Sequence, residues 1–167
     1  MKIEFGCGET PRTKGFKTCD IRDLPGIDFV CDAWEIDTIV EPNSVEHIYS
    51  RHFFEHLTFA QGLKFAEVCS RILKPGGCFE MLLPNFEFAV AQWLTEENVM
   101  DFNVPNPFER GMEGLWGKQR GGLDELWDTH KAGYKKWQLE KIFADLNFSK
   151  IGWAPSMVKE HHMVAFK

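Results

Sequence analysis

Short apolar runs, each long enough for a β-strand, alternate along this chain with segments that have the period of an α-helix. Strands are predicted at residues 2–6, 15–21, 27–34, 44–50, 78–84, 148–153 and 162–166. Helices are predicted at 58–73, 86–94 and 134–146, with a shorter one within 33–44. Such alternation favours an α/β fold with a mostly parallel sheet and helices on both faces. Ligands of these folds bind at the carboxyl ends of the strands.

Size and charge limit the function. The 167 residues suit a single domain, in which the Gly-, Pro- and aromatic-rich stretch at about 95–130 reads as a structureless insert or lid. The net charge of −6 disfavours nucleic acid and favours a small neutral or cationic ligand. The sequence shows no membrane span and no signal peptide, and its five cysteines include no CxxC pair, so we expect a cytoplasmic protein with reduced thiols.

Three of the cysteines, Cys7, Cys19 and Cys31, recur every twelve residues near predicted strand ends. Thiols gathered at one sheet edge are able to bind a metal, although structural zinc sites use closer pairs. Cysteine also packs as a small apolar residue. We favour packing, and we predict no metal site.

The glycine pair in "IEFGCGETP" predicts a cofactor loop after the first strand. A dinucleotide loop would carry a third glycine where this chain has Pro11, and its pyrophosphate would be repelled by Glu4. S-adenosylmethionine (SAM) carries a sulfonium and an ammonium group instead, which a carboxylate attracts. We therefore predict that SAM is the cofactor and that this loop contacts it through Glu4, Phe5, Gly6, Cys7, Gly8 and Pro11.

Two further acids stand at the ends of the second and third predicted strands. Asp20, followed by Ile21, is placed to accept hydrogen bonds from both ribose hydroxyls, each worth roughly 1.5–3 kcal/mol. Asp32 is placed to accept from the adenine amino group, and Ala33 and Trp34 to pack against the ring. Taken singly, Asp20 is equally typical of a turn and Asp32 of a helix cap.

In order and spacing, "IEFGCG", "CDI", "CDAW", "VEHIYSRHFFEHL" and "RILKPGGCFEMLLP" resemble the class I SAM-dependent methyltransferases, most of all the "type 11" branch. The resemblance covers residues 2–85 and resumes more weakly at "GYKKWQLEKIFADLNFSKI". It implies a Rossmann-like, seven-stranded, mostly parallel sheet whose last strand, 163–166, is antiparallel. Only residues 9–14 separate the glycine loop from the second strand, so the N-terminal helices should be reduced and the cofactor more exposed.

The resemblance further implies methyl transfer, here to a small molecule or a glycan precursor. It places Ser50, Arg51 and His52 beside the methionine end of SAM. His130, between the insert and the last predicted helix, is the candidate general base, although a histidine there is more often a cap or a surface residue. The insert aromatics Phe102, Phe108, Trp116 and Trp127 are equally typical of core and of an acceptor pocket.

Two alternatives remain open from the sequence. One is a degenerate fold that binds SAM without transferring its methyl group and serves as a binding or regulatory module. The other, more remote, is a zinc hydrolase, because "HFFEH" matches H-x-x-E-H, in which two histidines of one helical turn hold zinc. In the methyltransferase interpretation, Glu55 and His56 order the next loop or face the acceptor.

Overall fold

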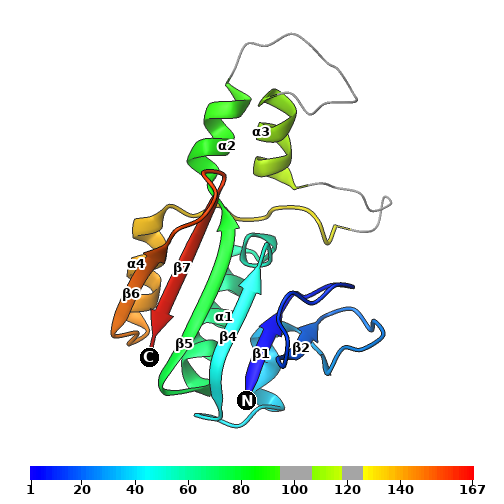
Figure 1. Cartoon of the computed structure of the whole chain (residues 1–167), viewed down its shortest axis with the longest axis vertical. Helices are drawn as coiled ribbons and strands as arrows, with labels where there is room; N and C mark the ends of the chain where they lie inside the picture. The colour runs from blue at the N-terminus through cyan, green and yellow to red at the C-terminus, as the bar shows by residue number, and fades with distance from the viewer. Residues whose placement is uncertain (95–106, 118–125) are drawn as a thin grey trace.

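The computed structural model describes residues 1–94, 107–117 and 126–167. Seven strands form one sheet in the order β3-β2-β1-β4-β5-β7-β6 (Figure 1). Only β7 runs antiparallel to its neighbours, β5 and β6. The predicted Rossmann-like sheet with an antiparallel last strand is thus confirmed. The strands are β1 (Lys2–Phe5), β2 (Lys17–Asp20), β3 (Phe29–Val30), β4 (Val45–Arg51), β5 (Leu73–Pro84), β6 (Lys150–Ala154) and β7 (Glu160–Phe166).

The carboxyl ends of β1, β2 and β4 meet at one edge. Phe5, the last residue of β1, is paired with Cys19 of β2 and with Ser50 of β4. Asp20 closes β2 opposite Val30 of β3. The register therefore brings the glycine loop, Asp20 and the end of β4 together, as predicted for the ligand-binding edge.

The third strand is much shorter than the predicted 27–34. It comprises only two residues, and the chain then turns into the 3-10 helix η1 (Ala33–Thr38). Ile36 of η1 is fully buried, and Val40 just beyond it is nearly so. The short helix predicted within 33–44 is thus present, and its first residues, Ala33 and Trp34, were wrongly included in the predicted strand.

Helix α1 (Phe59–Ile72) begins at a capping box made by Thr58 and Gln61, and α4 (Lys136–Asp145) precedes β6. Both helices lie behind the sheet in Figure 1. Residues 6–16, between β1 and β2, contain no helix, as the reduction of the N-terminal helices predicted. In that view no described helix covers the front face of the sheet. Within the sheet, His47 of β4 and His162 of β7 bond the half-buried Glu80 of β5.

Helix α2 (Phe86–Trp93) and helix α3 (Pro107–Trp116) pack against each other beyond the carboxyl edge of β5 (Figure 1). Helix α3 corrects the expectation of a structureless insert at 95–130. Its glycines, read from the sequence as loop residues, face α2 closely: a Cβ at Gly114 would lie 2.8 Å from Ala89 Cβ, and one at Gly111 2.7 Å from Trp93 Cα. Among the described residues, no helix is long and apolar enough to cross a membrane.

Candidate active site

A pocket of about 280 Å³ opens at the carboxyl ends of β1, β2 and β4. This volume is close to the lower end of the range for small-ligand sites, roughly 300–1,000 Å³. Six predicted cofactor residues line it, namely Gly6, Asp20, Ile21, Ala33, Trp34 and His52. Its other lining residues are Cys19, Arg22, Cys31, Phe53, His56, Leu57, Gln61, Trp127, Asp128 and Lys131.

Gly6 lies under the ring of Phe53. It adopts a positive φ of 63°, and a Cβ there would lie 2.6 Å from Phe53 Cγ. Its N–H donates to the carbonyl oxygen of Cys19 at 2.9 Å, which ties the glycine loop to β2. The glycine is therefore required by the close approach of a phenyl ring as well as by the backbone conformation.

Asp20 is 6% exposed, and its carboxylate joins β2 to the glycine loop. Oδ2 accepts from Gly8 N at 2.9 Å, and Oδ1 accepts from Arg22 N and Arg22 Nε, each at 3.1 Å. Burial alone would raise the pKa of Asp20, but the hydrogen bonds from Arg22 and Gly8 outweigh it and the pKa is lowered. Asp20 is thus an ionised acceptor in the pocket wall, already partnered by a cation.

The lowered pKa of Asp20 gives a testable pH dependence. A carboxyl group with a lowered folded pKa stabilises the protein above its unfolded pKa of 3.8 and loses that contribution as the pH falls towards the folded value. Arg22→Met should reduce the free energy of unfolding by about 0.5–1 kcal/mol near neutral pH, since the guanidinium is partly exposed. In urea titrations, this difference from wild type should shrink below pH 3.8. A difference that stays constant into acid would mean that Arg22 acts through packing alone.

Glu4 was predicted to attract the cationic cofactor, and the structure corrects this. Its carboxylate is 2% exposed and is not among the residues that line the pocket. It accepts from Arg12 N at 2.8 Å, Thr13 N at 2.9 Å and Thr13 Oγ1 at 2.5 Å. Glu4 therefore holds the loop that replaces a first helix.

The acid predicted for adenine also lies outside the pocket lining. Asp32 precedes η1, and its side chain makes no capping hydrogen bond, while its carbonyl oxygen accepts from Glu35 N at 2.9 Å. Its neighbours Ala33 and Trp34 do line the pocket, as does the exposed Ile21. An apolar wall is thus present on this side.

The other residues predicted to contact the cofactor from the glycine loop do not line the pocket. Phe5 is fully buried, and its ring packs edge-to-face on Phe65. Cys7 is 8% exposed, with Sγ 3.8 Å from the carbonyl oxygen of Cys19, and Pro11 is exposed. Gly8 contributes through its N–H to Asp20 rather than through the pocket surface.

The three residues predicted beside the methionine end of SAM, at the end of β4, differ in their surroundings. Ser50 is fully buried, and Arg51 donates to Glu160 Oε1 at 3.2 Å. Only His52 lines the pocket, with a positive φ of 49°. Its Nε2 lies 2.8 Å from Glu160 Oε1 and its Nδ1 3.3 Å from Glu55 Oε1, and these carboxylates raise its pKa, Glu55 most of all.

The structure places His130 at the C-terminus of the preceding helix, α3. Its backbone N–H donates to the carbonyl oxygen of Trp116 at 3.2 Å, and its Nδ1 to that of Gly114 at 3.0 Å, so it closes the C-terminus of α3. Burial lowers its pKa. The ring packs edge-to-face against His56, with centroids 4.9 Å apart, and His56 lines the pocket whereas His130 does not.

The H-x-x-E-H interpretation fails on geometry. The stretch ends β4 and continues as the 3-10 helix η2 (Phe54–His56), so His52 and His56 do not lie on one α-helical turn. The ring nitrogens of His52 are engaged by Glu160 and Glu55, while His56 Nδ1 bonds the carbonyl oxygen of Thr129 at 3.0 Å. A zinc hydrolase of the inverted-motif type is therefore not supported.

Sequence reasoning missed several residues of the pocket. Arg22 stands two positions after Asp20, where a cation would have signalled a partner for the acid. Phe53 gave no signal, because its contact with Gly6 joins residues far apart in the chain. Of the insert aromatics, Trp127 lines the pocket and Trp116 packs on Trp93, whereas Phe102 and the side chain of Phe108 lie outside the described residues.

No protein-family profile and no curated protein matches this sequence. Solved structures do match. A SAM-dependent methyltransferase from Archaeoglobus fulgidus is 14% identical, with a TM-score of 0.66 over 99% of this chain and 85% of its own. A putative S-adenosylmethionine-dependent methyltransferase from Listeria monocytogenes is 13% identical, with a TM-score of 0.62 over 99% and 90%.

A third solved structure is a putative O-methyltransferase from Nostoc punctiforme, 13% identical with a TM-score of 0.58 over 99% of this chain and 51% of its own. Identities this low establish the fold alone. The narrower resemblance to the type 11 branch stays a prediction. The sheet order, the antiparallel last strand and these matches together give the chain the fold of the class I SAM-dependent methyltransferases.

Proposed function

We propose that this protein is a SAM-dependent methyltransferase that acts on a small molecule or a glycan precursor. The observation that carries the proposal is Asp20, an ionised carboxylate at the end of β2 that lines a pocket at the ligand-binding edge of this fold. In α/β sheets of this kind, ligands bind outside the carboxyl ends of the strands. When bound, SAM supplies an activated methyl group for in-line displacement.

The pocket residues fit the adenosyl part of SAM. The Asp20 carboxylate would accept the ribose hydroxyls in place of the Arg22 side chain, which is partly exposed. Trp34, Ala33 and Ile21 supply an apolar wall for the adenine ring. With Glu4 held in the glycine loop, the acids that line the pocket are Asp20 and Asp128.

The remaining pocket residues fit the binding of an acceptor. His52, His56, Gln61 and Lys131 line the pocket and provide polar groups that could orient a hydroxyl or an amine. The chief work of the protein in methyl transfer is to align the acceptor and to exclude water. Of the two neighbouring histidines, His56 lines the pocket, whereas His130, the candidate general base from the sequence, does not.

Calorimetry with SAM and with its demethylated product, S-adenosylhomocysteine, tests cofactor binding. Asp20→Asn keeps the side-chain shape but removes the charge, so SAM affinity should fall about 10- to 100-fold, from the loss of charge-assisted hydrogen bonds. The matched control is Asp28→Asn. Asp28 precedes β3, accepts from Lys17 and Thr18, and does not line the pocket, so affinity should be unchanged.

Two outcomes would contradict the proposal. If wild-type protein binds neither ligand, the pocket is not a SAM site, and if Asp20→Asn binds as well as wild type, Asp20 is not in it. A labelled-methyl screen over hydroxylated, amino and sugar acceptors then tests transfer. SAM binding without transfer to any acceptor would favour the degenerate binding module.

A further inference from the structure

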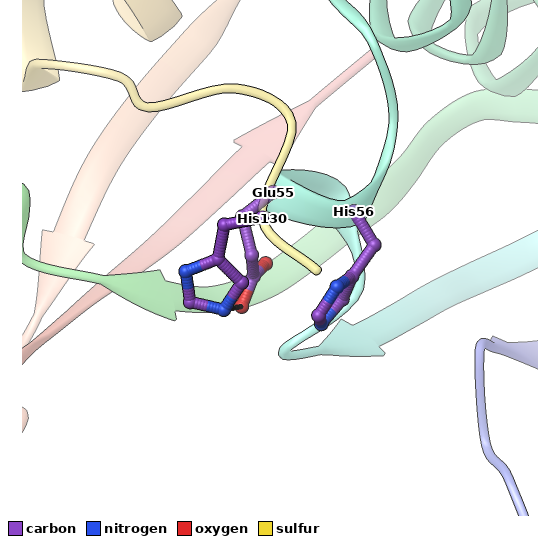
Figure 2. A group of neighbouring side chains, drawn as sticks. All are labelled: Glu55, His56 and His130. Atoms are coloured by element: carbon purple, nitrogen blue, oxygen red, sulfur yellow. Dashed lines mark ion pairs between the residues drawn. The ribbon is translucent and has the colours of Figure 1, made fainter. Parts of the chain in front are cut away.

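We propose that Glu55, His56 and His130 form a binding site for a divalent transition-metal ion of the Zn²⁺ class. Glu55 and His56 belong to η2, directly after β4, and His130 comes from the segment between α3 and α4. One ligand atom from each residue lies within 4.8 Å of the others. Figure 2 shows the carboxylate of Glu55 beside the His130 ring, with the His56 ring across from it.

Glu55 supplies the first reason to place an ion here. Its side chain is fully buried, and its Oε2 has no hydrogen-bond partner among the residues that the structure describes. The other oxygen, Oε1, lies 3.3 Å from His52 Nδ1 and 3.9 Å from His130 Nε2. Buried carboxylate oxygens are normally satisfied, so one that is not indicates a missing partner.

The two histidines supply the second reason. His56 Nδ1 lies 3.0 Å from the carbonyl oxygen of Thr129, and His130 Nδ1 lies 3.0 Å from that of Gly114. A carbonyl oxygen can only accept, so Nδ1 carries the proton in each ring, and Nε2 of the neutral ring keeps its lone pair. Metal-binding histidines are oriented in this way, with the second N–H donated to a carbonyl or carboxylate.

The donor set selects the class of metal. Two imidazoles and a carboxylate suit Zn²⁺ and similar first-row ions, whereas Mg²⁺ and Ca²⁺ prefer oxygen ligands alone. With bonds of about 2.0–2.2 Å, no two donors can lie more than about 4.4 Å apart, so modest rotations of the side chains close the site. Three protein ligands leave a coordination position for water or another oxygen ligand.

His52 acts on this site indirectly. It lies between Glu55 and Glu160, and its contact with Oε1 holds the Glu55 carboxylate while Oε2 stays available. The metal site therefore differs from the H-x-x-E-H arrangement: His130, distant in sequence, takes the place that the motif gives to His52. Because His56 lines the pocket, the ion would lie at the pocket wall.

The test uses tag-free, full-length protein, stripped with a chelator and then titrated with Zn²⁺ or Co²⁺ alone. We expect one ion per chain after removal of free metal, a Co²⁺ absorption spectrum of low coordination number, and a Zn²⁺-dependent rise in the melting temperature. His56→Gln and His130→Gln should each weaken Zn²⁺ at least about tenfold and remove the rise in melting temperature.

His161→Gln is the matched control, since His161 is a buried histidine on β7 outside the cluster, and its Zn²⁺ affinity should equal that of wild type. Cys31→Ser tests whether thiols hold the ion, and it should leave binding unchanged. Wild-type protein that retains no stoichiometric metal would overturn the proposal. So would retained binding in both His56→Gln and His130→Gln. None of these measurements requires SAM or methyl transfer, so the metal site stands or falls independently of the proposed function.

Discussion

Replacing Gly6 by alanine is expected to lower the free energy of unfolding by about 2–5 kcal/mol. The added methyl group would force a residue with a side chain into φ 63°, which costs roughly 1–2 kcal/mol. It would also overlap the Phe53 ring, whose Cγ lies 2.6 Å from the position that the alanine Cβ would take, and overpacking adds about 1–3 kcal/mol. Urea unfolding followed by fluorescence or circular dichroism measures the change.

The same chain offers a control that separates these two causes. Gly15 also has a positive φ, 77°, but an added Cβ would meet nothing within 4 Å. Gly15→Ala should therefore cost about 1 kcal/mol, from backbone strain alone. In a Phe53→Ala background, Gly6→Ala should cost no more than Gly15→Ala does. An undiminished effect of Gly6→Ala without the Phe53 ring would show that the close approach is not what requires glycine.

Replacing Glu4 by glutamine is expected to destabilise the fold by about 2–4 kcal/mol. The carboxylate accepts from Arg12 N, Thr13 N and Thr13 Oγ1, and it is nearly inaccessible to solvent. The amide keeps the size but turns one acceptor into an NH₂ donor that would face backbone N–H groups. A hydrogen bond to a charged group is worth roughly 1.5–3 kcal/mol, and an unpaired buried group adds to the loss.

Glu9→Gln is the control for this variant, because Glu9 is an exposed acid of the same loop. Its effect should stay within about 0.5 kcal/mol. A Glu4→Gln protein as stable as wild type would mean that the loop is held by other contacts. Loss of SAM binding with unchanged stability would return Glu4 to the cofactor, against the geometry described above.

The fold was readable from the sequence because most strands and helices depend on local patterns. Alternation of apolar residues marked the strands, and Thr58 followed by a helical period marked α1. Register then brought Gly6 and Asp20 to one edge without further information. One exception was β3, which comprises only Phe29–Val30 where a strand over 27–34 was predicted. The other was Pro107–Trp116, where residues typical of a loop form a helix because tertiary packing overrides local preference.

The residues of the site could be predicted only in part from the sequence. Whether a charged side chain lines the pocket depends on hydrogen-bond partners that local sequence does not indicate. Glu4 and Asp20 looked alike as acids beside a glycine pair. In the structure, Glu4 turns to Arg12 and Thr13, while Asp20 reaches the pocket. The residues around His130 in the sequence do not predict that its ring lies beside Glu55 and His56. That position depends on the hydrogen bond from the ring to Gly114 at the end of α3.

The dual bonding of His130 has a thermodynamic consequence. The Nδ1 of the imidazole donates to the carbonyl oxygen of Gly114 in the last turn of α3, and Nε2 lies 3.9 Å from Glu55 Oε1. A ligand bound to Nε2 would hold the ring in place and so stabilise the C-terminus of α3. By reciprocity, a well-formed C-terminus of α3 would raise the affinity of Nε2 for that ligand. The stability of the helix pair α2 and α3 and ligand binding at the carboxyl ends of the strands would then be coupled by one free energy.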